Sequence, residues 1–223
     1  MKLLFTFLCF IFSFKGFTQN TKPIIAFCPL CLVDEASYPT IQTGIEFYLS
    51  QRLSLYNEIG IKYRKGYYET ADTNFLGSKG FKIKTELRYN INSTKRHFKN
   101  IYIAINIFYN RDFHNTEIGY YYQRDGLKYW NDNFGVKKSV AGSNLLIGWK
   151  KAIWRKFLFD GYAGFGVRFI DISVVNKEFD KNRDDLQEPI DVTIVGIRNR
   201  VDANEGVGNI GNLTLGIRLC YKL

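Results

Sequence analysis

The sequence lacks long apolar runs once its first 18 residues are passed. A membrane-spanning helix requires about 20 predominantly apolar residues in succession. No later stretch approaches that length, so a helical membrane protein is excluded. Internal repeats of about 20 to 50 residues, which mark solenoid and propeller folds, are also lacking. The 223 residues are therefore expected to form a single domain.

Cysteine and histidine are scarce as well. Besides Cys9, the chain contains Cys28, Cys31 and Cys220, an odd number that does not make a disulfide framework. The "CPLC" spacing is typical of a redox pair, but its neighbours predict a strand, in which residues three apart point to opposite faces. Neither of the two histidines is close to this pair in sequence. The sequence therefore predicts no metal site and no cofactor.

The first 18 residues follow the pattern of a secretory signal peptide. Lys2 provides a basic start, residues 3–14 form a short apolar run, and the small residues Gly16 and Thr18 lie where cleavage would occur. We expect residues 1–18 to be a signal peptide and residues 19–223 to form the exported domain. An uncleaved anchor lying in the membrane interface is the alternative reading.

Positive charge predominates, with 31 Lys and Arg residues against 21 Asp and Glu residues. Removal of Lys2 and Lys15 with the signal peptide leaves 29 − 21 = +8. Such an excess can indicate nucleic acid, but these charges are spread along the chain and an exported protein rarely meets nucleic acid. The expected acidic partners are outer-membrane phospholipid and lipopolysaccharide.

Strict alternation of apolar and polar residues is abundant, and it is the signature of strands with two unlike faces. In "GFKIKTELRYN", residues 80–90, four of the five odd-numbered positions from 81 to 89 are apolar or aromatic, and the even-numbered positions from 82 to 88 are all charged. Eight segments are expected to be strands: 23–33, 41–50, 53–66, 79–91, 100–111, 139–150, 156–170 and 211–223. The first is the weakest, because Pro23 and Pro29 each remove a backbone donor.

Short and long connections alternate between these segments. The links after the second, fourth and sixth segments are short, whereas 67–78, 112–138 and 171–210 are longer and more polar. Barrels of the Gram-negative outer membrane have this alternation, an even strand number and both termini in the periplasm. We therefore predict an all-β fold, an eight-stranded antiparallel transmembrane up-and-down β-barrel. A soluble eight-stranded barrel also alternates and is the alternative.

The charged face favours the membrane barrel. It also carries most of the strand glycines, while the opposite face carries bulky apolar side chains. The interior of eight strands is just wide enough to be filled by side chains, so small residues belong there. Charges inside must be paired, which predicts an ion-pair network that plugs the lumen in place of an open pore. The predicted network consists of Glu46, Glu58, Lys62, Lys82, Lys84, Glu86, Arg88, Asp160, Arg168 and Arg218.

Segments 41–66, 79–91, 157–170 and the terminal "LTLGIRLCYKL" resemble the small outer-membrane β-barrel proteins of OmpA-like or OmpW-like type. The resemblance covers almost the whole mature chain and rests on strand pattern. It implies eight antiparallel strands, insertion by the barrel assembly machinery and no reaction. Such chains often end on an aromatic residue, whereas Tyr221 lies two places before Leu223 here.

These features predict an outer-membrane protein, not an enzyme, with a structural, adhesive or ligand-binding role carried by its external loops. An extracellular protein or ligand would bind through loops 112–138 and 171–210. A narrow porin-like channel is one alternative. The carboxylates of 171–210 are a further candidate, for a divalent cation, but their spacing matches no defined calcium loop.

A lipid-modifying enzyme is the other alternative. Its nucleophile, base and orienting group would have to lie near the membrane face. On the external side, His114 with Ser139 or Ser143 and Glu117 is the only set available.

The short links are basic. Within and directly beside the link between the sixth and seventh segments, the sequence places Lys150, Lys151, Arg155 and Lys156. Such residues either hold anionic lipid headgroups of the inner leaflet or form a solvated surface.

Overall fold

The computed structural model describes residues 22–33, 39–63, 79–91, 100–122, 128–178, 180, 182, 184–186, 193–194, 197–198 and 206–223. The predicted signal peptide at residues 1–18 and the predicted link 67–78 lie outside the described residues.

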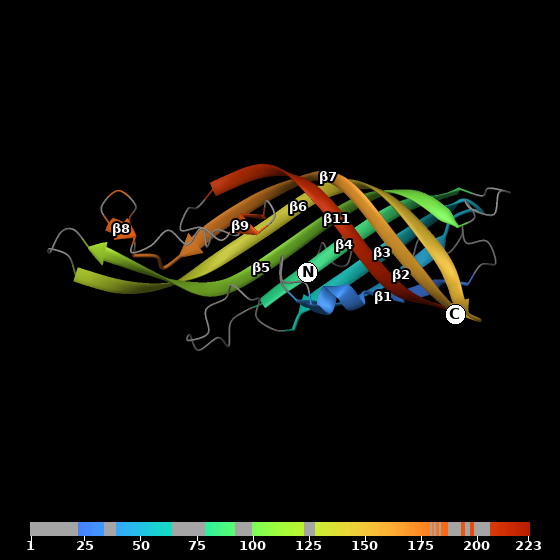
Figure 1. Ribbon diagram of the computed structural model, residues 1–223, viewed down its shortest axis with the longest axis horizontal. Coiled ribbons are helices and arrows are strands. Elements are labelled where there is room, and N and C mark those ends of the chain that lie inside the picture. The colour runs from blue at the N-terminus through green and yellow to red at the C-terminus, as the bar shows by residue number, and fades with distance from the viewer. Residues whose placement is uncertain are drawn as a thin grey trace, which may run out of the picture.

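Eight antiparallel strands make up most of the described chain. Their bounds are β1 (Ile24–Phe27), β2 (Thr40–Tyr48), β3 (Leu53–Lys62), β4 (Lys79–Ile91), β5 (Ile101–Tyr122), β6 (Lys128–Trp154), β7 (Phe157–Val175) and β11 (Gly206–Lys222). They lie in the order β4-β3-β2-β1-β11-β7-β6-β5, and β5 pairs in turn with β4. Each of the eight therefore has a hydrogen-bonded neighbour on both sides, and the sheet closes on itself (Figure 1). The predicted all-β fold of eight antiparallel strands is confirmed.

Smaller elements accompany this closed sheet. β8 (Asp184–Leu186) pairs with the far end of β5, and β9 (Thr193–Ile194) pairs with β10 (Ile197–Arg198). The helical element of the described residues is a 3-10 helix, η2 (Pro29–Val33). Within the described residues, no helix has the length and apolar character needed to cross a membrane.

The eight strands share one parity: even-numbered residues face the interior and odd-numbered residues face outward. In β5, for example, burial alternates without a break from Tyr102, which is fully buried, to Tyr109, which is exposed. The outward face is apolar, and one row of paired residues crosses six strands. That row is Leu55, Leu87, Ile105, Leu145, Phe165 and Leu213. Its last member is 88% exposed, so the usual arrangement of a soluble protein is inverted.

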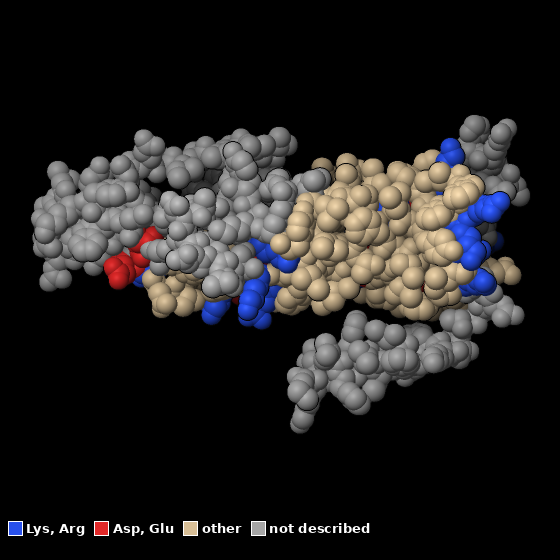
Figure 2. All heavy atoms as spheres, turned by 90° about the horizontal axis from the view of Figure 1, so that it is seen from below, with Lys and Arg blue, Asp and Glu red and all other residues tan. Residues whose placement is uncertain are grey.

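Basic residues border this apolar outer surface. Figure 2 shows a wide area without charged residues between two groups of Lys and Arg. At the end that holds the short turns and the C-terminus, the exposed bases of the described chain are Lys22, Arg52, Lys151, Arg155, Lys156 and Lys222. At the opposite edge they are Lys79, Arg111 and Lys137. We call the area between them the apolar belt, and the two ends the turn end and the outer end.

Several strands continue well past their predicted ends, so the prediction of a loop at 112–138 is wrong. β5 has 22 residues and β6 has 27, and they pair as one long hairpin up to Tyr122 and Lys128. Residues 171–175 and 206–210 likewise belong to β7 and β11. Beyond the belt, outward positions such as Arg111 and Lys137 are charged, so alternation no longer marks the strand.

The first predicted segment, 23–33, is wrong after Phe27. There β1 ends and η2 begins at Pro29, whose missing N–H is no loss in a first helical turn. The Cys31 N–H donates to the Cys28 carbonyl at 3.3 Å. This turn brings the two Cα atoms to 5.6 Å, and the two cysteines form a disulfide. They do not point to opposite faces of a strand, as the sequence had suggested.

Candidate functional site

Eight charged side chains converge inside the closed sheet, towards the turn end, and we call them the charged core. They come from β2, β3, β4, β6, β7 and β11. The members are Glu46, Glu58, Lys84, Glu86, Arg88, Lys150, Asp160 and Arg218. Four are acidic and four are basic, so their formal charges cancel. Pairing of this kind is what permits charge in an interior, because an unpaired buried ion is strongly disfavoured.

Arg88 is the central cation of the charged core. Its Nε and Nη2 donate to Oε2 of Glu86 at 2.8 and 2.6 Å. Its Nη1 donates to Oε2 of Glu46 and to Oδ2 of Asp160, both at 3.2 Å. One guanidinium on β4 is therefore bonded to carboxylates on β4, β2 and β7, across the width of the interior.

Arg218 of β11 plays the matching role on the other side. Its Nη2 donates to Oε1 of Glu86 at 2.5 Å, and its Nε donates to Oε2 of Glu58 at 2.9 Å. Its Nη1 lies 3.5 Å from Oδ2 of Asp160. Glu86 and Asp160 are thus shared between the two guanidinium groups, which makes the two arginines one unit.

Two lysines complete the pairing. Lys84 Nζ lies 2.8 Å from Oε1 of Glu58, and Lys150 Nζ donates to both oxygens of Glu46 at 2.5 and 2.6 Å. Glu46 also accepts from the Ser54 hydroxyl at 2.6 Å. Every carboxylate of the charged core therefore contacts two cationic groups.

Three tyrosines interleave with the two arginines. The Arg88 guanidinium lies 4.7 Å from the Tyr102 ring centroid and 4.1 Å from that of Tyr56. The Arg218 guanidinium lies 4.4 Å from Tyr56 and 3.9 Å from Tyr162. The order is a continuous stack of alternating rings and cations, Tyr-Arg-Tyr-Arg-Tyr, in which each contact is favourable because the ring face is negative.

The tyrosine hydroxyls add to the same network. Tyr102 donates to Oδ1 of Asp160 at 2.8 Å, and Tyr56 donates to Oε2 of Glu58 at 2.6 Å. The stack therefore binds the carboxylates as well as the cations.

Glycines on neighbouring strands make room for the rings. A Cβ atom at Gly148 would overlap the Tyr102 ring, and one at Gly216 would overlap the Tyr162 ring. Both pairs are directly opposite each other in the sheet. A strand glycine is expected where another group approaches the backbone this closely. The glycine-rich character of the inward face thus follows from the width of the aromatic stack.

Polar side chains continue from the charged core to the outer end. Asn144 donates to Asn106 at 2.9 Å and accepts from Asn212 at 2.7 Å. Further out, Asp112 contacts Lys62 Nζ at 2.8 Å and His114 Nδ1 at 2.9 Å. Beyond the belt, burial by itself raises the pKa of Asp112. The His114 hydrogen bond and the Lys62 ammonium outweigh it and hold that pKa below its usual value.

Seven of the ten residues predicted for the network meet in the charged core. The other three do not. Lys62 pairs with Asp112 instead, and Lys82 is buried two positions from Lys84 towards the outer end. Arg168 is half-buried, and within the described part of the chain its Nε has no hydrogen-bond partner.

Sequence reasoning missed Lys150 and the three tyrosines. The sequence pattern groups Lys150, the last residue of segment 139–150, with the basic link that follows. In the structure β6 continues to Trp154 and the turn is only Arg155 and Lys156. The available indication was that Lys150 lies two residues after Gly148, so that in a continued strand both point inward. The tyrosines also fell on the polar, even-numbered face of their segments, which was the indication that they point inward.

The candidate catalytic set is not assembled. His114 lies on the inward face, whereas Ser139 accepts a hydrogen bond from Tyr109 on the outward face at 3.4 Å. Ser143 is exposed on that outward face, and the Glu117 side chain lies outside the described residues. In the described chain, no group of three or more His, Cys, Asp or Glu residues is placed to hold a metal ion.

Comparisons with protein-family models, curated proteins and solved structures find no match to this chain. Its class is therefore defined by the fold and the site themselves. The protein is a closed antiparallel sheet of eight strands with an ionised, aromatic-stacked core inside and apolar side chains outside.

Proposed function

We propose that this protein is a transmembrane β-barrel of a Gram-negative outer membrane that presents a long external hairpin for binding or adhesion. The supporting observation is the inverted distribution of side chains. Arg88, Arg218 and Glu86 are fully buried inside, while Leu213 and Phe165 are 88% and 68% exposed outside. A soluble barrel would place the apolar side chains inside, whereas lipid contact favours this arrangement.

The strand lengths support an external structure. A transmembrane strand needs about 9 to 11 residues, whereas β6 has 27. The surplus lies at the outer end, where β5 and β6 extend away from the other strands and β8 adjoins β5 (Figure 1). The turn end holds Lys222 and its partner Ile24, and in this topology it faces the periplasm. The barrel assembly machinery would insert such a chain.

The hairpin replaces the predicted loops as the proposed binding surface. It presents strand backbone outside the membrane, and peptide partners commonly bind by adding a strand to an exposed edge. The acids of 184–186 lie beside its end through β8. We assign the structural, adhesive or ligand-binding role to this region.

The charged core favours a plug over the porin-like channel. Ion pairs cross the interior from β4 to β2, β7 and β11, with the tyrosine stack between them. Opening a path would separate buried partners, and a buried charge without its partner is strongly disfavoured. The lipid-modifying enzyme has less support, because His114 and Ser139 lie on opposite faces of the sheet.

Two measurements test this proposal. Membrane fractionation with heat-modifiable migration in detergent gels should place the mature protein, folded, in the outer membrane; recovery in the soluble fraction would contradict it. Planar-bilayer recordings at moderate salt should then show no steady conductance, and a stable unitary channel would favour the porin-like alternative.

A further inference from the structure

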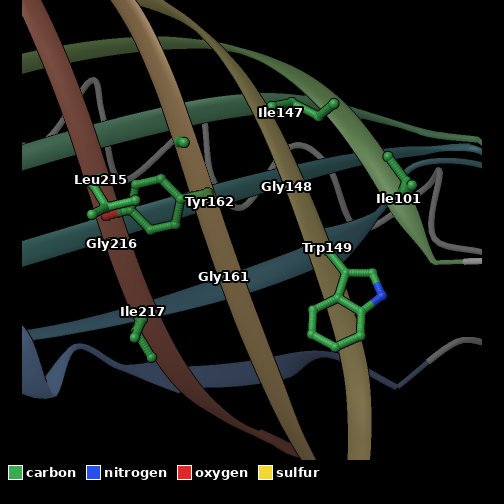
Figure 3. A pocket seen from close by; sticks show the side chains of 10 residues that line it. Ile101, Ile147, Gly148, Trp149, Gly161, Tyr162, Leu215, Gly216 and Ile217 are labelled. Atoms are coloured by element: carbon green, nitrogen blue, oxygen red, sulfur yellow. The ribbon is translucent and has the colours of Figure 1, made fainter.

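A groove runs along the outer face of the apolar belt near the turn end. It has a volume of about 390 Å³ and its outward lining is apolar. Figure 3 shows Ile147 and Trp149 on one side of Gly161, with Leu215 and Ile217 on the other. The space is formed by the outer wall, not by the charged interior.

The groove follows from the sequence of β7. This strand places Gly161 and Ala163 outward, between two strands that carry large side chains at the paired positions. Gly161 lies opposite Trp149 and Ile217, and Ala163 lies between the two aliphatic residues paired with it. Two successive outward positions without bulk therefore leave a furrow, and the Phe159 ring bounds it at Gly161, where an added Cβ would lie 3.2 Å from the ring.

Basic residues lie immediately beyond the turn-side rim of this groove. The rim is the Phe159 ring, whose centroid is 6.3 Å from that of Trp149. Lys151 Nζ lies 5.8 Å from the Trp149 ring, and Lys156 Nζ lies 5.4 Å from the Tyr221 ring. Cations above interface aromatics are held where a lipid phosphate would lie.

Charge at this end is of one sign. Among the described residues with a known exposure, the exposed acids are Asp171, Glu178 and Asp180, and all three belong to the outer end. The apolar groove therefore adjoins a basic rim, and in the described part of the turn end no exposed Asp or Glu side chain competes with an anion. That combination complements a molecule with an acyl chain and an anionic headgroup.

We propose that the groove binds one anionic diacyl phospholipid of the leaflet at the turn end. An acyl chain lies over Gly161 and Ala163 between the walls of β6 and β11. The phosphate contacts Lys151, with Arg155 and Lys156 of the adjacent turn nearby. This inference rests on the proposed membrane insertion and adds a specific lipid site to it.

The test is native mass spectrometry of the mature protein folded in zwitterionic detergent micelles. Phosphatidylglycerol should bind once, in preference to phosphatidylcholine of the same chain length. Lys151→Gln should weaken phosphatidylglycerol binding by about fivefold, the effect of one surface cation on an anionic lipid. Equal binding of the two lipids would overturn the proposal.

A second pair of variants tests the groove. Ala163→Phe fills the furrow, whereas Ser143→Phe adds the same ring on the outward face of β6 outside it. The first should abolish the single high-affinity phosphatidylglycerol site and the second should leave it unchanged. Retention of the site in Ala163→Phe would contradict the acyl position. Competition by glycerol phosphate at similar concentrations would show a headgroup-only site and also contradict it.

Folding is scored in the same samples by heat-modifiable migration. If the wild-type chain never acquires the heat-modifiable form in micelles or bilayers, the membrane proposal fails. If it does and shows no preference for phosphatidylglycerol, only the lipid site fails.

Discussion

Arg88 and Asp160 meet across the interior of the sheet, with Nη1 and Oδ2 3.2 Å apart. Their strands, β4 and β7, are not neighbours: β5 and β6 separate them on one side, and four strands do so on the other. Strand pairing alone fixes only adjacent strands. This contact, with those of Arg218, holds opposite walls together and fills the space that a channel would need.

Replacement of Arg88 by Ala should therefore destabilise the folded protein strongly. Glu46, Glu86 and Asp160 would each lose a cationic partner while remaining buried, which costs about 3–5 kcal/mol. Urea unfolding in micelles, followed by gel migration, measures the change. Lys137→Ala, at an exposed outward position of β6, is the matched control and should change stability by no more than about 0.5 kcal/mol. Equal effects of the two variants would show that the core pairs are not coupled to folding.

A second prediction compares two glycines of β11, of which only one lies against a tyrosine ring. Gly216→Ala places a methyl group into the Tyr162 ring, whose centroid lies 3.9 Å from the Arg218 guanidinium. Overpacking of this kind costs about 1–3 kcal/mol. Gly211→Ala, also on β11, meets nothing within 4 Å and should be neutral or slightly stabilising. The same unfolding assay compares them, and a neutral Gly216→Ala would mean that the ring can move aside.

The local stability of the outer end should depend on pH through the carboxyl group of Asp112. Burial opposes its ionisation, but the His114 hydrogen bond and the Lys62 ammonium prevail, so its pKa is lower folded than unfolded. A lowered pKa contributes stability above the unfolded value, 3.8, and that contribution is lost as pH falls through the folded pKa. The protection factors of amides around residues 109–115, which are exchange rates corrected for the intrinsic effect of pH, should therefore fall below about pH 4.

Asp112→Asn is the control for this effect. It removes the titrating group, so exchange in the same segment should be faster at neutral pH and should lose this step in acid. If the acid step persists unchanged in Asp112→Asn, another group is responsible for it.

The alternation of apolar and polar residues in the sequence was enough to predict most of the strands. In β4, the spacing of Glu86 and Arg88 put both on one face, and the glycines of that face indicated that it points inward. The same logic failed where the outward face stopped being apolar. At Arg111 of β5 and Lys137 of β6 the outward residue is charged, so the alternation of apolar and polar residues ends there although both strands continue.

Other features depend on three-dimensional contacts that no local pattern encodes. The tyrosine-arginine stack joins β3, β4, β5, β7 and β11, and its order follows from how the closed sheet brings those strands together. Lys62 does not join the charged core because it lies at the outer end of β3, where it pairs with Asp112. The Cys28–Cys31 disulfide required the end of β1 to be recognised, for which Pro29 was the available signal.

The lipid exposure of the apolar belt is tested most directly by a spin label at Leu213→Cys in reconstituted vesicles. Cys9 is removed with the predicted signal peptide, the native Cys220 is buried, and Cys28 and Cys31 are joined to each other, so the label reacts at the new site. Collision with oxygen, which concentrates in lipid, should be frequent, and collision with a water-soluble nickel chelate should be rare. A label at Lys137→Cys, beyond the belt, should show the reverse. Free access of the nickel chelate to both labels would contradict a membrane-spanning barrel.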